Sequence, residues 1–362
     1  MVHIMVRRSP SASADADVAR ILTDPGFASF PCDHMVRAQF RDGVWSEPEI
    51  VPYAPLTFDP STNFLHYGQS IFEGLKAYRH PDGGVALFRP ERNAKRFNRS
   101  AVRLAMPELP EEYFLDSIAA LVDLERRWVP DDPERSLYIR PFMLGTEVAL
   151  GVKPSADYLF LVIAAPAGAY FRNGVEPVRV WISDDYVRAA PGGTGEAKCA
   201  GNYAASLIAQ AEAADRGCDQ VVWLDATERR WVEEMGGMNL FFVLGEGPTA
   251  RLLTPELTGS LLPGITRESL LTLAADLGYD VGEGRISRDE WREGCASGEI
   301  SEVFACGTAA VITPVGSVRS HQHSWEIGDG TPGPVAMQLR QRLLDIQTGR
   351  QPDPHRWVRR IP

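Results

Sequence analysis

Gly192-Gly-Thr-Gly-Glu-Ala-Lys-Cys-Ala-Gly-Asn-Tyr203 is the stretch on which the interpretation of this sequence depends. Its one lysine, Lys198, lies among small residues directly before a predicted helix. Small neighbours leave room for a bulky planar group close to the backbone. A lysine partly desolvated there gives up its proton more readily, as Schiff-base formation requires. A glycine-rich turn with a solvated lysine has the same composition, so this stretch alone leaves both interpretations open.

Two further segments offer hydrogen-bond donors to a phosphate. Leu262-Pro-Gly-Ile-Thr-Arg-Glu268 places N–H groups and a threonine hydroxyl at a predicted helix start. The unpaired donors and the dipole of a helix start favour an anion. Cys306-Gly-Thr-Ala-Ala310 lies between two strand-like runs and offers a hydroxyl and N–H groups in a turn. Each segment is equally typical of an ordinary helix cap or tight turn.

The pattern of apolar residues along the chain predicts a mixed α/β fold. A chain of 362 residues exceeds the usual size of a single hydrophobic core, so two domains are expected. Helical periodicity and strand-like runs predict helices over 93–106, 111–128, 203–216 and 266–277, and strands over 136–144 and 158–165. The predicted organisation is a flexible lead-in at 1–26, a small N-terminal domain at 27–166, a linker loop at 167–177 and a large C-terminal domain at 178–362.

Composition argues against several classes of partner. The net charge of −11 argues against nucleic acid or an anionic membrane surface. No run of about 18 apolar residues is present, so no membrane span is expected. The five scattered cysteines lack CxxC spacing, which favours a reducing cytoplasm over a disulfide framework. The seven histidines form no HxxxH or HExxH pattern, and His321 and His323 are interpreted as loop residues, so no metal site is predicted.

Seven segments, taken together, resemble branched-chain amino acid aminotransferases, which are fold-type IV enzymes dependent on pyridoxal 5'-phosphate (PLP). They are HYGQSIFEGLKAYR (66–79), RPERNAKRFNRSAVRLAMP (89–107), LYIRPFMLGTE (137–147), GGTGEAKCAGNYAASL (192–207), VEEMGGMNLFFV (232–243), SLLPGITRESLL (260–271) and EVFACGTAAVITPV (302–315). They occur in family order with family-like spacing. The resemblance implies a small N-terminal α/β domain and a larger C-terminal pseudo-barrel domain that supplies most contacts to PLP.

The resemblance also implies roles for individual residues. Lys198 matches the Schiff-base lysine, Tyr203 the tyrosine at the phenolic oxygen of the cofactor, and Glu234 the carboxylate facing its pyridine nitrogen. Phosphate-binding positions are matched by Arg96, Ile265, Thr266 and Thr308. Substrate-pocket positions are matched by Phe27, Tyr67, Phe72, Tyr138, Arg140, Tyr170 and Ala309. The choice of Glu234 over Glu233 rests on the spacing to the following Met-Gly-Gly.

The chain departs from the family pattern at a few positions. Ala28 and Pro31 replace residues usual around Phe27, which makes that pocket position less secure. Ala200 stands two residues after Lys198, where glycine is common. Some family members carry a redox CxxC after Gly-Thr-Ala, but Ala310 and Thr313 occupy those positions here, so no such switch is expected.

The expected reaction transfers the amine of L-leucine, L-isoleucine or L-valine to 2-oxoglutarate, giving branched-chain 2-oxo acids and L-glutamate. The expected partners are therefore small amino and 2-oxo acids, and the resemblance implies a homodimer. Other activities of the same fold stay open: a D-amino acid aminotransferase, an aminodeoxychorismate lyase, or a specialised aminotransferase for an unusual β-branched or aromatic acid. A non-catalytic binding protein is disfavoured by the presence of Lys198, Tyr203 and Glu234.

Overall fold

The computed structural model describes residues 2–170 and 174–362, which divide into two compact units. Within the described residues, unit 1 comprises 2–170, 197–200 and 345–362, and unit 2 comprises 174–196 and 201–344. The lysine segment 197–200 and the C-terminal segment thus belong with the N-terminal half, although the sequence suggests a C-terminal domain running unbroken from 178. Residues 171–173 of the expected linker lie outside the described residues.

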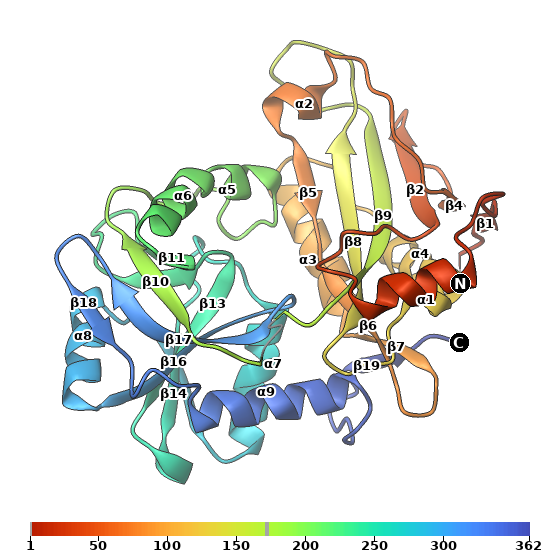
Figure 1. Ribbon diagram of the computed structural model, residues 1–362. Helices are drawn as coiled ribbons and strands as arrows, with labels where there is room; N and C mark the ends of the chain where they lie inside the picture. The colour runs from red at the N-terminus through yellow and green to blue at the C-terminus, as the bar shows by residue number, and fades with distance from the viewer. Residues whose placement is uncertain (1, 171–173) are drawn as a thin grey trace. The chain divides into compact units, whose positions relative to one another are not determined.

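Unit 1 is built on a ten-stranded, mainly antiparallel sheet (Figure 1). Its strands run β1-β4-β2-β9-β8-β6-β7-β19, with β3 paired to β2 and β5 paired to β8. They are β1 (Met5–Val6), β2 (His34–Arg41), β3 (Val44–Trp45), β4 (Glu49–Pro52), β5 (Ser70–Phe72), β6 (Leu75–Arg79), β7 (Val85–Phe88), β8 (Ser136–Gly145), β9 (Tyr158–Ala167) and β19 (Val358–Arg360). Strand β9 is apolar and buried over nearly its whole length, as expected for a central strand covered on both faces.

The helices of unit 1 share one core with the sheet. They are α1 (Asp15–Thr23), α2 (Asn63–Tyr67), α3 (Pro90–Arg103), α4 (Glu111–Leu124) and the 3₁₀ turn Arg126–Trp128. Phe97 of α3 and Phe114 of α4 pack against Phe160 of β9. Helix α3 begins three residues before the predicted start, because Pro90 suits the first helical turn, where its missing N–H is not needed.

The N-terminal segment contains ordered elements where the composition suggested a flexible lead-in. Strand β1 pairs in parallel with β4, and helix α1 buries Val18. Both the backbone N–H and the hydroxyl of Ser13 donate to Asp33 at 2.8 Å. These tertiary contacts order the segment, and they cannot be inferred from its Ser, Ala and Asp content.

Unit 2 is built on a closed ring of six strands. The pairings run β12-β11-β10-β17-β16-β13, and β13 pairs back to β12. Three further strands extend the sheet: β14 and β15 beyond β13, and β18 on β17. The strands are β10 (Val178–Ser183), β11 (Gln220–Leu224), β12 (Val232–Met235), β13 (Met238–Leu244), β14 (Arg251–Pro255), β15 (Asp280–Gly284), β16 (Ile300–Gly307), β17 (Val311–Arg319) and β18 (Ser324–Glu326). This mixed α/β chain with a closed barrel confirms the predicted fold class.

The remaining helices are α5 (Ala200–Ala204), α6 (Leu207–Asp215), α7 (Ile265–Asp276), α8 (Arg288–Ser297), α9 (Pro334–Gln347) and the 3₁₀ turn Gly247–Thr249. The prediction of a single helix over 203–216 is wrong, because the helix is interrupted between the end of α5 and the start of α6. The hydroxyl of Ser206 donates to the carbonyl oxygen of Tyr203 at 2.7 Å, a local bond that competes with helix continuation. Within the described ranges, no helix has the length and apolar content needed to cross a bilayer.

Candidate active site

Lys198 lies in unit 1, where both of its backbone polar groups are bonded. Its N–H donates to the Ser100 hydroxyl at 2.9 Å, and its carbonyl oxygen accepts from the Phe72 N–H at 3.0 Å. Its side-chain nitrogen lies 4.8 Å from the centre of the Phe72 ring. The lysine amine is therefore placed over an aromatic face rather than in open solvent.

Aromatic rings and the Arg140 guanidinium lie near Phe72, the residue whose ring the Lys198 amine faces. The Arg140 guanidinium lies 4.8 Å from the Phe72 ring centre and donates to the Tyr138 hydroxyl at 2.9 Å. The Tyr138 ring contacts the Phe27 ring at a centroid distance of 5.4 Å. A side chain at Gly74 would overlap the Tyr138 hydroxyl, so glycine is required there. The structure thus brings together five of the predicted residues: Phe27, Phe72, Tyr138, Arg140 and Lys198.

Tyr67 has other surroundings in unit 1. The Tyr67 hydroxyl donates to the carbonyl oxygen of Leu150 at 2.5 Å, and its ring contacts His66. Tyr170 is half-exposed at the end of the first described range. Within unit 1, these contacts of Tyr67 therefore lead to the 148–152 loop and not to the group around Phe72.

Ala28 follows Phe27 in a left-handed backbone conformation, with φ of 53°. Glycine adopts this conformation without the steric cost that Cβ imposes, which accounts physically for the glycine usual at this position in the family. The Ala28 N–H donates to the Pro166 carbonyl oxygen at 3.2 Å, and this bond holds the turn despite the methyl group. The departure at residue 28 therefore leaves Phe27 in contact with Tyr138.

Arg96 of helix α3 is paired with a carboxylate that the sequence analysis did not single out. Its guanidinium donates to both oxygens of Glu73, at 2.7 and 2.9 Å, and Asn93 donates to the same carboxylate at 2.8 Å. Burial opposes ionisation of Glu73, but Arg96, Lys198 and Asn93 together hold the pKa of this carboxyl below its ordinary value. Glu73 thus supplies a fixed negative charge between Arg96 and Lys198.

Glu234 lies on β12 in unit 2 and is almost fully buried. One of its oxygens accepts from the Leu262 N–H at 2.9 Å and from the Asn239 amide at 3.1 Å. The Arg188 guanidinium lies 2.7 Å from the other oxygen. These partners hold the buried carboxylate in one orientation.

Glu233, the neighbouring acid, is also buried. The Ser260 hydroxyl donates to its carboxylate, and burial raises the pKa of this carboxyl. The Ser260 carbonyl oxygen in turn accepts from Arg188 at 2.6 Å. The two adjacent glutamates therefore have different electrostatic surroundings, since Arg188 lies directly against only Glu234.

The predicted phosphate positions lie at a helix start and in a hairpin turn of unit 2. Ile265 and Thr266 open helix α7 and are buried. Gly264 precedes them, and a side chain there would overlap the Asn239 amide oxygen. Asn239 therefore links Glu234 to the entry of α7.

Thr308 and Ala309 lie in the turn between β16 and β17. Val311 closes this turn with φ of 65°, a strained conformation for a β-branched residue. Tyr203 lies elsewhere in the unit, with its ring against Gly237. Gly237 belongs to the Met-Gly-Gly spacing that selected Glu234, so this spacing also lies beside Tyr203.

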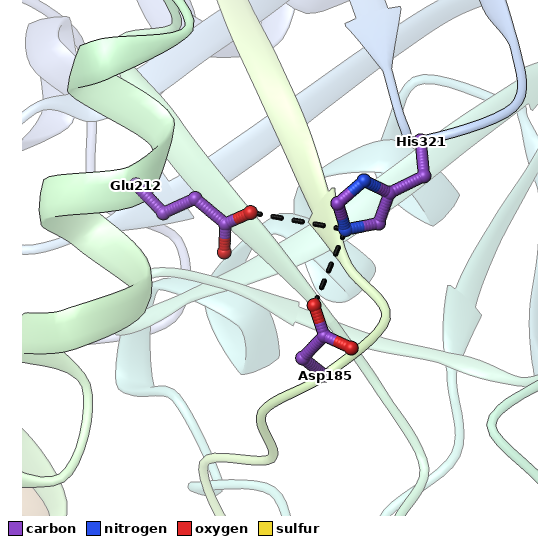
Figure 2. A group of neighbouring side chains, drawn as sticks. All are labelled: Asp185, Glu212 and His321. Atoms are coloured by element: carbon purple, nitrogen blue, oxygen red, sulfur yellow. Dashed lines mark hydrogen bonds and ion pairs between the residues drawn. The ribbon is translucent and has the colours of Figure 1, made fainter.

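His321 belongs to a polar group on the surface of unit 2 that the spacing in the sequence does not indicate (Figure 2). Its Nε2 lies 3.2 Å from Asp185 and 3.8 Å from Glu212. The same oxygen of Glu212 also accepts from Arg216 at 3.2 Å. The group is therefore a network of charged and titratable side chains from three separate segments.

Several residues of the site carried no local signal. Glu73 and Asn239 lie inside matched segments, but their roles appear only from the partners that folding brings to them. Ser100 lies one helical turn after Arg96, a spacing that places both side chains on one face. Arg188 stands alone between apolar residues, and nothing near it in the sequence marks it.

Known proteins resemble this chain over nearly its whole length. The family model described as amino-transferase class IV matches residues 70–318. The branched-chain-amino-acid aminotransferase of Mycolicibacterium smegmatis is 57% identical, covering 99% of this chain and 98% of that protein. The branched-chain-amino-acid transaminase 1 of Bacillus subtilis is 49% identical, covering 92% of this chain and 93% of that protein. A crystal structure of the T.th. branched-chain amino acid aminotransferase with pyridoxamine 5'-phosphate superposes with a TM-score of 0.74 at 34% identity, covering 90% of this chain and 98% of that one.

These likenesses agree with the fold described above. The chain belongs to the class IV aminotransferase family and, within it, to the branched-chain-amino-acid aminotransferases. The predicted family and enzyme class are thereby confirmed.

Proposed function

We propose that the protein transaminates L-leucine, L-isoleucine and L-valine with 2-oxoglutarate, using PLP. The observation that carries this proposal is the group in unit 1, where the Lys198 amine, two aromatic rings and Arg140 lie together. A nucleophilic amine beside an apolar surface suits an aliphatic amino acid. The names of the relatives at 49–57% identity support the same substrate class.

The residues of unit 2 fit the pyridine ring and phosphate of PLP. The buried, oriented carboxylate of Glu234 suits a protonated ring nitrogen, and the buried start of α7 with its N–H groups suits a phosphate. Tyr203 and Thr308 complete the proposed cofactor set, and Arg96 of unit 1 is assigned to the phosphate. When bound, PLP supplies an electron sink for breaking the Cα–H bond of the substrate.

The protein residues then handle binding and the proton. Lys198 would hold the cofactor through its Nζ, and this amine, once displaced by the amine of the substrate, would accept the Cα proton as a general base. Glu234 would favour the charged form of the ring nitrogen. The aromatic rings at Phe27, Phe72 and Tyr138 exclude water from the apolar side chain of the substrate.

The pocket must accept an aliphatic side chain and the γ-carboxylate of glutamate in turn. The T.th. enzyme has been crystallised with N-(5'-phosphopyridoxyl)-L-glutamate and with 4-methylvaleric acid, which represent the two kinds of side chain. Here the rings of Phe27 and Phe72 offer the apolar surface, and Arg140 with the Tyr138 hydroxyl offers donors. The family resemblance also assigns substrate contacts to Tyr67, Tyr170 and Ala309, although within unit 1 the Tyr67 hydroxyl is bonded to Leu150 in the 148–152 loop.

The test is an amino-donor panel with 2-oxoglutarate on purified wild-type protein, Lys198→Ala and Lys95→Ala. Lys95 lies exposed on the same helix as Arg96 and serves as the control lysine. We expect L-leucine, L-isoleucine and L-valine to be the best donors and only Lys198→Ala to be inactive. Preferred turnover of D-amino acids or of a larger modified amino acid would overturn the substrate assignment. Activity retained in Lys198→Ala would overturn the lysine assignment.

We further propose that the protein works as a homodimer in the cytoplasm. Exposed apolar residues of unit 1 gather on α2 and the 148–152 loop, which are joined by the bond from Tyr67 to Leu150. They are Leu65, Val148, Leu150 and Val152, all more than half exposed. Contiguous exposed apolar groups of this kind mark protein contacts. The five cysteines are all free thiols, which fits a reducing compartment.

A further inference from the structure

Hydrogen bonds and a β-bridge join the backbone around Lys198 to unit 1. Residues 197–200 belong to unit 1, but the residues on both sides of them belong to unit 2. These contacts include the bond from the Lys198 N–H to Ser100, the bond from the Phe72 N–H to the Lys198 carbonyl, and the bridge between Ile71 and Cys199. Of these, only the bond to Ser100 is made by a side chain.

The Ser100 hydroxyl acts as a hydrogen-bond donor to one neighbour and as an acceptor from another. It is almost fully buried on helix α3, and its proton is donated to the Arg96 carbonyl oxygen at 3.0 Å. Its oxygen therefore faces the Lys198 N–H as an acceptor, at 2.9 Å. One helical turn of α3 thus carries both Arg96 and the side chain that holds the lysine backbone.

The position fixed in this way determines what the lysine amine faces. The Lys198 nitrogen lies over the Phe72 ring, and the neighbouring residue Glu73 is a buried carboxylate whose charge interacts with Lys198. A shift of the Lys198 backbone along β5 would move the amine away from both. Displacements of about 1 Å in a reacting group can cost on the order of 10²-fold in rate.

We propose that Ser100 is a positioning residue that fixes Lys198 for reaction with the cofactor. The proposal rests on the PLP function proposed above and extends it to a residue that does not touch the reacting atoms. Removing the hydroxyl leaves the Lys198 N–H without its acceptor, so the segment 197–200 opens more often and the amine samples unproductive positions.

The test compares Ser100→Ala with Ser117→Ala. Ser117 is a matched control because it is fully buried on helix α4 of the same unit and its hydroxyl has no hydrogen-bond partner within the described residues. Two quantities are measured on the full-length protein. The first is amide hydrogen exchange of the peptide containing residues 197–200 without cofactor. The second is the rate at which PLP is captured at Lys198, followed by borohydride trapping and peptide mass spectrometry.

We expect Ser100→Ala to exchange about tenfold faster in that peptide and to capture PLP about tenfold more slowly, with Ser117→Ala equal to wild type in both. Equal behaviour of the two variants would overturn the proposal. Faster exchange with unchanged capture would also overturn it, because the hydroxyl would then serve only the fold.

A second variant and a wild-type control cover the cases in which Ser100→Ala does not fold or PLP is not captured. If Ser100→Ala does not fold, Ser100→Cys replaces it, since sulfur keeps the volume but is a weak acceptor. Intermediate values for Ser100→Cys support the proposal, and wild-type values overturn it. Failure of wild-type protein to capture PLP would contradict the proposed cofactor. The exchange measurement is made without cofactor, so it would still report on the hydrogen bond between Ser100 and Lys198.

Discussion

Residues that are adjacent in the sequence can have opposite roles, and Glu233 and Glu234 illustrate this. Glu234 is held by Arg188, Asn239 and a backbone N–H, so its charge is stabilised and oriented. Glu233 is buried against a serine hydroxyl, and its burial favours the protonated form. Only Glu234 has the surroundings that a permanent carboxylate requires.

We therefore expect Glu234→Gln to lower kcat by about 10²–10³-fold with cofactor still bound, because one preorganised charge contributes about that much to rate. Glu233→Gln should stay near the wild-type kcat, since glutamine can still accept from Ser260. Steady-state kinetics and the absorbance of bound cofactor measure both effects. A reversed result would show that Glu233 is the carboxylate facing the pyridine.

Glu233 also predicts a pH dependence of stability. Its pKa in the folded protein is raised above the ordinary value of 4.5. Protonated Glu233 contributes fully to the free energy of unfolding at pH values below 4.5, the ordinary pKa. This contribution is lost as pH rises through the raised pKa of the folded protein. The unfolding midpoint of Glu233→Gln should therefore improve relative to wild type as pH increases from about 4.5. Urea titrations at several pH values check this, and a constant difference across the range would contradict it.

Arg140 holds the Tyr138 hydroxyl and lies over Phe72, so its loss affects the polar part of the proposed pocket. Arg140→Met should weaken glutamate and 2-oxoglutarate use by about 10- to 100-fold, as a hydrogen bond to a charged group contributes about 1.5–3 kcal/mol. Leucine should be affected less. Single half-reactions with each substrate separate the two effects. Equal losses would mean that Arg140 serves the α-carboxylate or the architecture of the pocket.

At the scale of elements, the start of helix α9 depends on a side chain from a distant strand. Both oxygens of Glu302 on β16 accept from the first turn of α9, one from the Val335 N–H and one from the Ala336 N–H, each at 2.9 Å. The N–H groups at a helix start have no partner within the helix. A side chain at Gly333 would overlap Glu302, so the glycine makes this cap possible.

Glu302→Ala should therefore destabilise the protein by about 1–3 kcal/mol, the cost of leaving buried donors unsatisfied. Glu302→Gln retains one acceptor oxygen and should cost less. The exposed Glu299, close by in the sequence, provides the control Glu299→Ala, which should be near neutral. Urea unfolding measures all three variants. Equal stability of Glu302→Ala and Glu299→Ala would show that Glu302 does not cap α9.

At the scale of the whole molecule, the proposed homodimer depends on the exposed apolar residues of unit 1. Leu150→Asp places a charge among them, and burying an unpaired carboxylate is costly. We expect the dissociation constant of the dimer to rise at least about tenfold, which corresponds to about 1.4 kcal/mol. Light scattering after size-exclusion chromatography measures it. Val44→Asp, at an exposed position on β3, is the control. A dimer unaffected by Leu150→Asp would place the interface elsewhere.

The sequence by itself determined the family, the mixed α/β class and several of the longer elements, whereas the 14-residue helix α9 has no counterpart among the predicted elements. Helix α7 and strands β8 and β9 are recognisable from their own residues, because periodicity, caps and apolar runs are local properties. The resemblance implied a barrel, but only the tertiary structure decided which six strands close it, how the N-terminal segment is ordered and that residues 197–200 belong with unit 1. The tertiary structure alone also decided which side chains pair with Lys198, Arg96 and Glu234. Ser100, Glu73 and Arg188 acquire their roles from long-range hydrogen bonds, and no local pattern specifies which distant group a buried polar side chain will meet.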